Sequence, residues 1–110
     1  MNRREELDDI FKEVDPNEKK LVNRLIDEVV FLETQMTSLK QLPFISINPK
    51  NSAQQKITPA AKLYKECSQS YMNAIRILCS ILHKIDSSAE NELLKKLSEF
   101  EWLKHHTLII

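Results

Sequence analysis

The sequence predicts an all-α protein: a long antiparallel helical hairpin and a third, C-terminal helix, all in a single domain (residues 1–110) that oligomerises. Three observations predict this fold class. The chain contains no glycine, its four prolines fall between apolar repeats, and those repeats have the spacing of α-helices. A chain of 110 residues supports one modest core.

The first segment, residues 1–14, is expected to be a lead-in to the hairpin. Residues 3–12 of this lead-in could form a short helix, because their apolar residues fall on one side of it: Leu7, Ile10 and Phe11.

The first long helix is predicted over residues 16–42. Asp15 is a suitable N-cap, Pro16 fits the first helical position, and Pro43 stops the helix. Its apolar residues form a heptad seam: Val22, Leu25, Val29, Leu32, Met36 and Leu39.

Residues 43–57 are expected to form a loop, because Pro43 and Pro49 are incompatible with a continuous helix. The letters "FISI" within it alternate as a short strand would. A connection of this length is long for a helical hairpin, so the loop is either functional or partly disordered.

The second long helix is predicted over residues 59–85, with Thr58 as its cap and Pro59 at its first position. Matched length and matched seams predict that the two long helices pack antiparallel. The second seam consists of Ala60, Tyr64, Cys67, Tyr71, Ala74, Leu78, Ile81 and Ile85.

A third helix is predicted over residues 88–104, because "SSAE" is a capping box. The remaining residues, 105–110, form a tail that ends in the apolar letters "TLII". This tail either frays or docks onto a partner or a sister subunit.

Further apolar residues lie beside the seams, namely Leu21, Ile26 and Val30 on the first long helix and Leu63 and Ile77 on the second. They belong either to a plain core or to a surface that a second copy covers. The candidate oligomer or partner contacts are Ile77, Trp102, Leu108, Ile109 and Ile110.

No arrangement of residues indicates catalysis, so we expect the protein not to be an enzyme and to use no cofactor. The pair Cys79 and His83 has the spacing of two helical metal ligands, but no second pair accompanies it, and we expect no metal site. Cys67 lies on the seam and is expected to be a small buried residue. No apolar run is long enough to span a membrane, and the charged first residues do not form a signal peptide, so we expect a soluble, intracellular protein.

The zero net charge conceals a basic middle. Residues 43–85 hold six basic residues and one acidic residue, whereas the segments on both sides are acidic. Cations at helical spacing on residues 59–85 either are solvated, pair with acids of the first long helix, or contact phosphate. The candidate nucleic-acid contacts are Lys50, Lys56, Lys62, Lys65 and Arg76. Base recognition would need further groups, from the Asn-rich loop or from Arg3 and Arg4.

Two stretches, "LVNRLIDEVVFLETQMTSLK" and "ITPAAKLYKECSQSYMNAIRILCSIL", resemble the small terminase subunit of tailed phages. The likeness is to the short form carried by phages and prophages of Gram-positive bacteria, and it covers residues 20–85. The matching positions are Leu25, Asp27, Glu28 and Phe31 in the first stretch, and Pro59, Ala60 and Tyr64 in the second.

This resemblance implies a non-catalytic DNA-packaging protein in the cytoplasm of a bacterial host. Such a subunit binds double-stranded viral DNA, assembles into a homo-oligomeric ring, and recruits or regulates the large terminase subunit. The competing hypothesis is a helical protein–protein adaptor, or an antitoxin-like regulator, without DNA binding.

Overall fold

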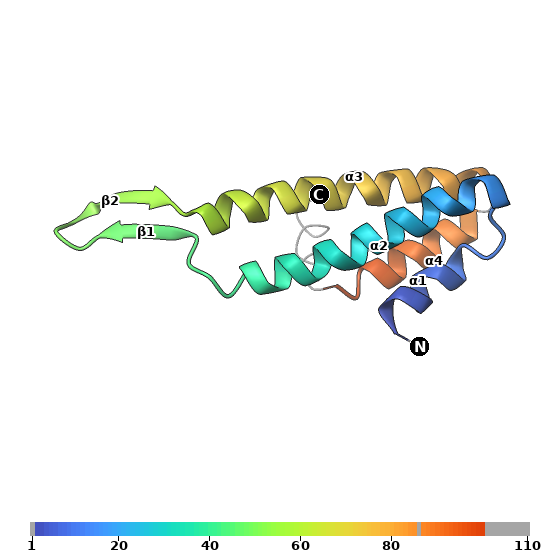
Figure 1. The fold of residues 1–110 in the computed structure, drawn as a ribbon, viewed down its shortest axis with the longest axis horizontal. Helices are drawn as coiled ribbons and strands as arrows, with labels where there is room; N and C mark the ends of the chain where they lie inside the picture. Colours follow the sequence, from blue (N-terminus) through green and yellow to red (C-terminus); the bar gives the residue numbers. More distant parts are fainter. Residues whose placement is uncertain (1, 86, 101–110) are drawn as a thin grey trace.

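Two long helices lie side by side along an elongated molecule of 59 × 26 × 23 Å, and a narrow β-ribbon extends from one end of them (Figure 1). The computed structural model describes residues 2–85 and 87–100. These residues contain four helices and one two-stranded antiparallel sheet, and the structure is 71% helical.

The first helix, α1, covers Arg3–Ile10. A capping box starts it: the Asn2 side chain accepts a hydrogen bond from the Glu5 amide at 2.8 Å, and the Glu5 carboxylate accepts one from the Asn2 amide at 3.3 Å. Helix α1 packs against α2 and α4. Its buried apolar residues, together with those of the turn that follows, are Leu7, Ile10, Phe11 and Val14.

The two long helices are α2, which covers Pro16–Leu39, and α3, which covers Pro59–Ile85. The Asp15 carboxylate accepts a hydrogen bond from the Asn17 amide at 2.8 Å at the start of α2. The helices run antiparallel in contact with each other (Figure 1). Their buried seam residues are Val22, Val29, Leu32, Met36, Leu39, Cys67, Tyr71, Ala74, Leu78 and Ile81.

The β-ribbon consists of β1, Ile45–Asn48, and β2, Asn51–Ile57. Its base is fixed to the helices in two ways: the rings of Phe44 and Tyr64 lie 5.2 Å apart, and the Thr58 hydroxyl donates to the Pro43 carbonyl at 2.7 Å. The ribbon therefore continues the hairpin without a linker.

The last described helix, α4, covers Ser87–Leu97 and packs against α3 and α1, with Leu93 and Leu97 fully buried. Helices α1 and α4 together cover one side of the hairpin. Leu63 and Ile77, two heptads apart on α3, stay nearly half exposed on a side that these helices leave open.

The predicted fold class is wrong: the protein is not all-α with three helices. Residues 43–57 pair as a ribbon instead of forming a loop, because main-chain hydrogen bonds hold β1 and β2 together although β2 is polar. The lead-in contributes a fourth helix.

Several predicted bounds and burials also change. Helix α2 ends at Leu39 rather than at residue 42. Pro43 disfavours helical geometry at the residue before it, Leu42. Helix α4 ends at Leu97, before the predicted end at residue 104, and the tail 105–110 lies outside the described residues. Ile26 is fully buried and needs no second copy to cover it, whereas Ile85 is 44% exposed despite its seam position.

Candidate nucleic-acid interface

The distal end of the molecule is made by the end of α2, the ribbon and the start of α3, and it carries cations without acids. Residues 34–65 contain no aspartate or glutamate. All five lysines of this segment are exposed, and within the part of the chain that the structure describes none of them lies in an ion pair. We call them the ribbon-end lysines: Lys40, Lys50, Lys56, Lys62 and Lys65.

Four of the five predicted nucleic-acid contacts belong to this end, and Arg76 does not. Arg76 lies eleven residues beyond Lys65 on α3, which corresponds to about 16 Å along the helix. It lines a shallow hollow with Glu18, Leu21 and Ile77, and its guanidinium contacts the Asn73 side chain at 3.4 Å. The predicted set missed Lys40, which the acid-free run around it could have indicated.

The ribbon has two chemically different faces, because cross-strand partners point to the same side. The pairs Ile45–Ile57 and Ile47–Gln55 place three isoleucines on one face, exposed by 54–65%. The pair Ser46–Lys56 lies on the other face. A shallow hollow at this part of the ribbon is lined by Ser46, Asn48, Gln54 and Lys56, and also by Ile47 and Pro49.

The tip of the ribbon turns without glycine, and among the described residues none has a positive φ. The register shifts between Ile47, which pairs with Gln55, and Asn48, which pairs with Asn51, so the pairing is irregular next to the turn. Asn48 holds the tip through two hydrogen bonds: its oxygen accepts from the Lys50 amide at 2.9 Å, and its amide nitrogen donates to Gln54 Oε1 at 2.7 Å.

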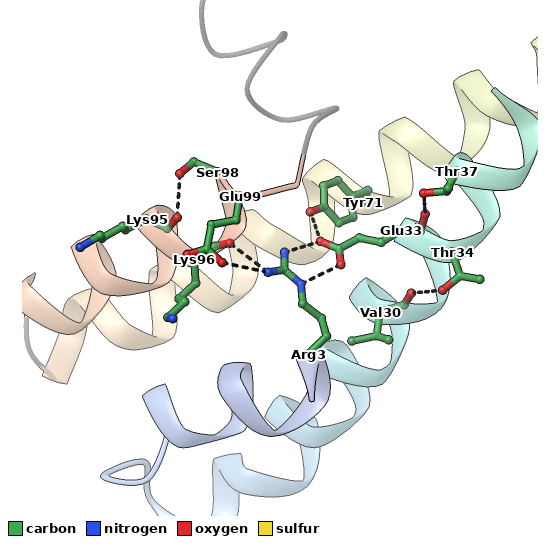
Figure 2. Close-up of polar contacts among 10 residues, drawn as sticks. All are labelled: Arg3, Val30, Glu33, Thr34, Thr37, Tyr71, Lys95, Lys96, Ser98 and Glu99. Carbon is green, nitrogen blue, oxygen red and sulfur yellow. Dashed lines mark hydrogen bonds and ion pairs between the residues drawn. The ribbon is translucent and has the colours of Figure 1, made fainter. Parts of the chain in front are cut away.

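A second polar cluster lies in the helical body, where α1, α2, α3 and the end of α4 meet (Figure 2). The Arg3 guanidinium donates to both carboxylate oxygens of Glu33, at 2.9 and 2.8 Å, and to the Lys96 carbonyl at 3.0 Å. The Tyr71 hydroxyl donates to Glu33 Oε2 at 2.6 Å. Glu33 is buried, so these donors compensate the loss of its hydration.

The environment of this cluster shifts two pKa values. The hydrogen bonds that Arg3 donates to the Glu33 carboxylate raise the pKa of Arg3. Burial and, next, the charge of Glu33 raise the pKa of Tyr71 well above its ordinary value. Both residues therefore keep their protons near neutral pH, and the hydrogen bonds of the cluster join four parts of the fold.

The sequence interpretation missed this cluster, although one feature of the sequence could have indicated it. Glu33 follows Ile26 and Val30 at helical spacing, so a carboxylate occupies an apolar stripe and requires a buried partner. The same contacts remove Arg3 as a candidate base reader. Arg4 is also engaged, with Asp27 and Asp8.

The predicted oligomer contacts are only partly described. Ile77 is 45% exposed and lies beside Leu21, which is exposed to a similar degree. Trp102, Leu108, Ile109 and Ile110 lie outside the described residues.

The geometry of the described residues gives little support for a metal site or a reactive thiol. Across residues 2–85 and 87–100, no three histidine, cysteine or acidic side chains gather as metal ligands would. Cys67 and Cys79 carry free thiols whose pKa values are raised by burial, which disfavours the thiolate. Among the described helices, none is both long and apolar enough to cross a membrane.

Comparisons with known proteins give no match: no family model fits this chain, and searches of curated proteins and solved structures find no significant similarity. The resemblance to small terminase subunits therefore remains a prediction from the residues quoted above.

Proposed function

We propose that this chain is a non-catalytic subunit that binds duplex DNA through its ribbon end. The observation that carries the proposal is the run of residues 34–65, whose five lysines are exposed and whose sequence contains no acid. Exposed cations attract phosphate where few acids compete for them. The nearest acid after the run is Glu66, one residue past Lys65, and among the described residues no ion pair joins it to these lysines.

The residue likeness supports a more specific role as the small subunit of a phage DNA-packaging terminase. In this role the protein assembles into a homo-oligomeric ring in the host cytoplasm and recruits or regulates the large subunit. Five lysines make only a few phosphate contacts per chain, and a ring increases avidity by repeating them. The open side of α3, with Leu63 and Ile77 exposed, is the surface that we assign to contact between copies.

Duplex binding measured across a range of salt concentrations tests the DNA-binding role. The triple variant Lys56→Glu, Lys62→Glu, Lys65→Glu should bind much more weakly than the wild type. It should also lose about two to three units from the slope of log K against log salt, since each lost phosphate contact removes about 0.9.

A matched control separates the ribbon end from overall charge. The variant Lys12→Glu, Lys20→Glu, Lys95→Glu changes the net charge by the same amount at exposed positions of the helical body. It should keep a near-normal salt slope. Equal losses in the two variants would show that net charge alone controls binding, and an unchanged slope in the ribbon-end variant would reject the site.

The alternative is a protein–protein adaptor without DNA binding. The observation that favours it is the uncovered isoleucine face of the ribbon, since exposed apolar side chains of this kind often contact proteins. Light scattering after size-exclusion chromatography distinguishes the two hypotheses. A ring that Ile77→Asp dissociates supports the terminase role, and a monomeric wild type supports the adaptor.

A further inference from the structure

The β-ribbon has the dimensions of an element that enters a DNA groove. It projects beyond the ends of α2 and α3 (Figure 1), and every residue from 45 to 57 is exposed. Adjacent strands lie about 4.8 Å apart, and the major groove of B-DNA, about 12 Å wide, admits a two-stranded ribbon.

The polar face of this ribbon carries the side chains that read bases. Asparagine and glutamine can bond to adenine in the major groove, lysine to guanine, and serine to either. The face presents Ser46, Asn48, Gln54 and Lys56 around one shallow hollow, which Ile47 and Pro49 also line. Asn48 donates to Gln54 Oε1 at 2.7 Å, so this hydrogen bond orients Gln54, whose amide nitrogen carries two donors. The opposite face presents mainly isoleucine, so only one side of the ribbon suits a base edge.

Charge complementarity favours duplex DNA as the occupant of this face. Lys56 belongs to the polar face itself, and the other ribbon-end lysines lie near its two ends: Lys50 at the tip, Lys40 directly after α2, and Lys62 and Lys65 near the start of α3. Lysines at such positions suit the phosphates that border a groove. The other candidates for base reading, Arg3 and Arg4, are held in ion pairs of the helical body.

We propose that the face formed by Ser46, Asn48, Gln54 and Lys56 enters the DNA major groove and confers sequence preference. This inference rests on the proposed function, because it requires that the ribbon end bind duplex DNA. It specifies which element binds the DNA, with which of its faces, and in which groove. Phosphate contacts by the other four ribbon-end lysines position the protein, and the side chains of this face discriminate between bases.

The test begins with selection of the full chain against a pool of DNA duplexes with a randomised centre, and the wild type should enrich a preferred sequence. Gln54→Ala should reduce the affinity for that sequence at least about fivefold relative to the random pool, the lower limit for loss of one good base contact. Its salt slope should stay normal, because no phosphate contact is removed.

Neighbouring Gln55 provides the matched control. Gln54 and Gln55 are both exposed on β2, but Gln55 pairs with Ile47 on the isoleucine face. Gln55→Ala should therefore keep both the preference and the affinity. Because Gln54→Ala also removes the hydrogen bond from Asn48, amide hydrogen exchange of residues 45–57 in both variants checks that the ribbon keeps its order. Equal loss of preference in the two variants would overturn the assignment of the face.

The groove is tested with methylated duplexes of the enriched sequence. Methylation at guanine N7, which lies in the major groove, should block preferred binding, whereas methylation at adenine N3 in the minor groove should not. The reverse result would overturn the groove assignment. Duplex RNA should show no sequence preference, since its deep, narrow major groove excludes the ribbon.

Failure of this inference is distinguishable from failure of the proposed function. A wild type that binds duplex DNA with the expected salt slope, but without sequence preference or with a preference that Gln54→Ala leaves intact, overturns only the reading face. A wild type that does not bind duplex DNA overturns both.

Discussion

The helical body and the ribbon end differ in how their basic residues are placed relative to acids. In the body, basic residues of α1 and α2 pair with acids, as in Arg3–Glu33, Arg4–Asp27 and Lys19–Asp8. At the ribbon end, five lysines face solvent along a segment without acids. The comparison shows that a neutral chain can separate its charges along its long axis, so net charge alone does not exclude a polyanionic partner.

The two regions also differ in the interactions that stabilise them. The body has a continuous apolar core, whereas the ribbon depends on main-chain pairing and on contacts at its base. A two-stranded ribbon is at best marginally stable by itself in water. Substitutions should therefore affect global stability in the body and only local order in the ribbon.

The largest expected effect is in the body. Leu78→Ala should lower the free energy of unfolding by about 2–5 kcal/mol, because the side chain is buried in the seam and its removal leaves a cavity. Ile47→Ala in the ribbon should change it by less than about 0.5 kcal/mol, as is usual for exposed positions. Urea denaturation measures both. Similar losses at the two positions would mean that the ribbon is part of the cooperative core.

An intermediate effect is expected at the polar cluster. Tyr71→Phe removes a hydrogen bond to the buried Glu33 carboxylate and should lower the free energy of unfolding by about 1–2 kcal/mol. The loss is limited because Arg3 still binds both carboxylate oxygens. Chemical denaturation at neutral pH measures it. A neutral substitution would show that Arg3 alone satisfies Glu33.

The same residue predicts a pH dependence. The pKa of Tyr71 is raised in the folded state, so above the ordinary value of 10.0 the unfolded chain releases this proton while the folded chain keeps it. Stability should therefore fall as pH rises above 10, by up to about 1.4 kcal/mol per pH unit from this group. Thermal unfolding of wild type and Tyr71→Phe between pH 9 and 11, values chosen around that pKa, should give a steeper decline for the wild type. Parallel declines would contradict the shift.

The smallest expected effect is at the junction of the two regions. Thr58→Ala removes the cap of α3 and the hydrogen bond to the Pro43 carbonyl. It should lower the local stability of the junction by about 1 kcal/mol. The change should appear as faster amide hydrogen exchange in residues 45–57, with little change in the body. Faster exchange throughout α2 and α3 would show that the junction supports the whole hairpin.

Local patterns predicted the long helices but not everything that packs on them. Thr58 and Pro59 mark the start of α3 where the structure has it, since capping is local chemistry. In contrast, β2 has a polar sequence without alternation, and its pairing depends on main-chain groups that no side-chain pattern reveals. The sequence left open whether Ile26 belongs to the core or to a surface between copies, because the docking of α1 depends on contacts between distant residues, such as Arg3 with Glu33.

The candidate site was predicted in part for a related reason. Charge composition along the chain identified Lys50, Lys56, Lys62 and Lys65, because these positions are close in sequence as well as in space. Helical spacing also placed Arg76 with them, although it lies farther along α3. The polar face of the ribbon depends on cross-strand register, which the sequence does not indicate.

The contact between Arg3 and the Lys96 carbonyl has a consequence for biosynthesis, because it joins residues 93 positions apart. Glu33 leaves the ribosome long before Lys96, by roughly 3–13 s at usual rates of translation. The salt bridge between Arg3 and Glu33 can thus form on the nascent chain, Tyr71 can join it later, and the carbonyl of α4 completes the cluster last. A nascent chain from which Ile85, the end of α3, has emerged but Lys96 has not would therefore hold three of its four helices, with the last hydrogen-bond partner of Arg3 missing.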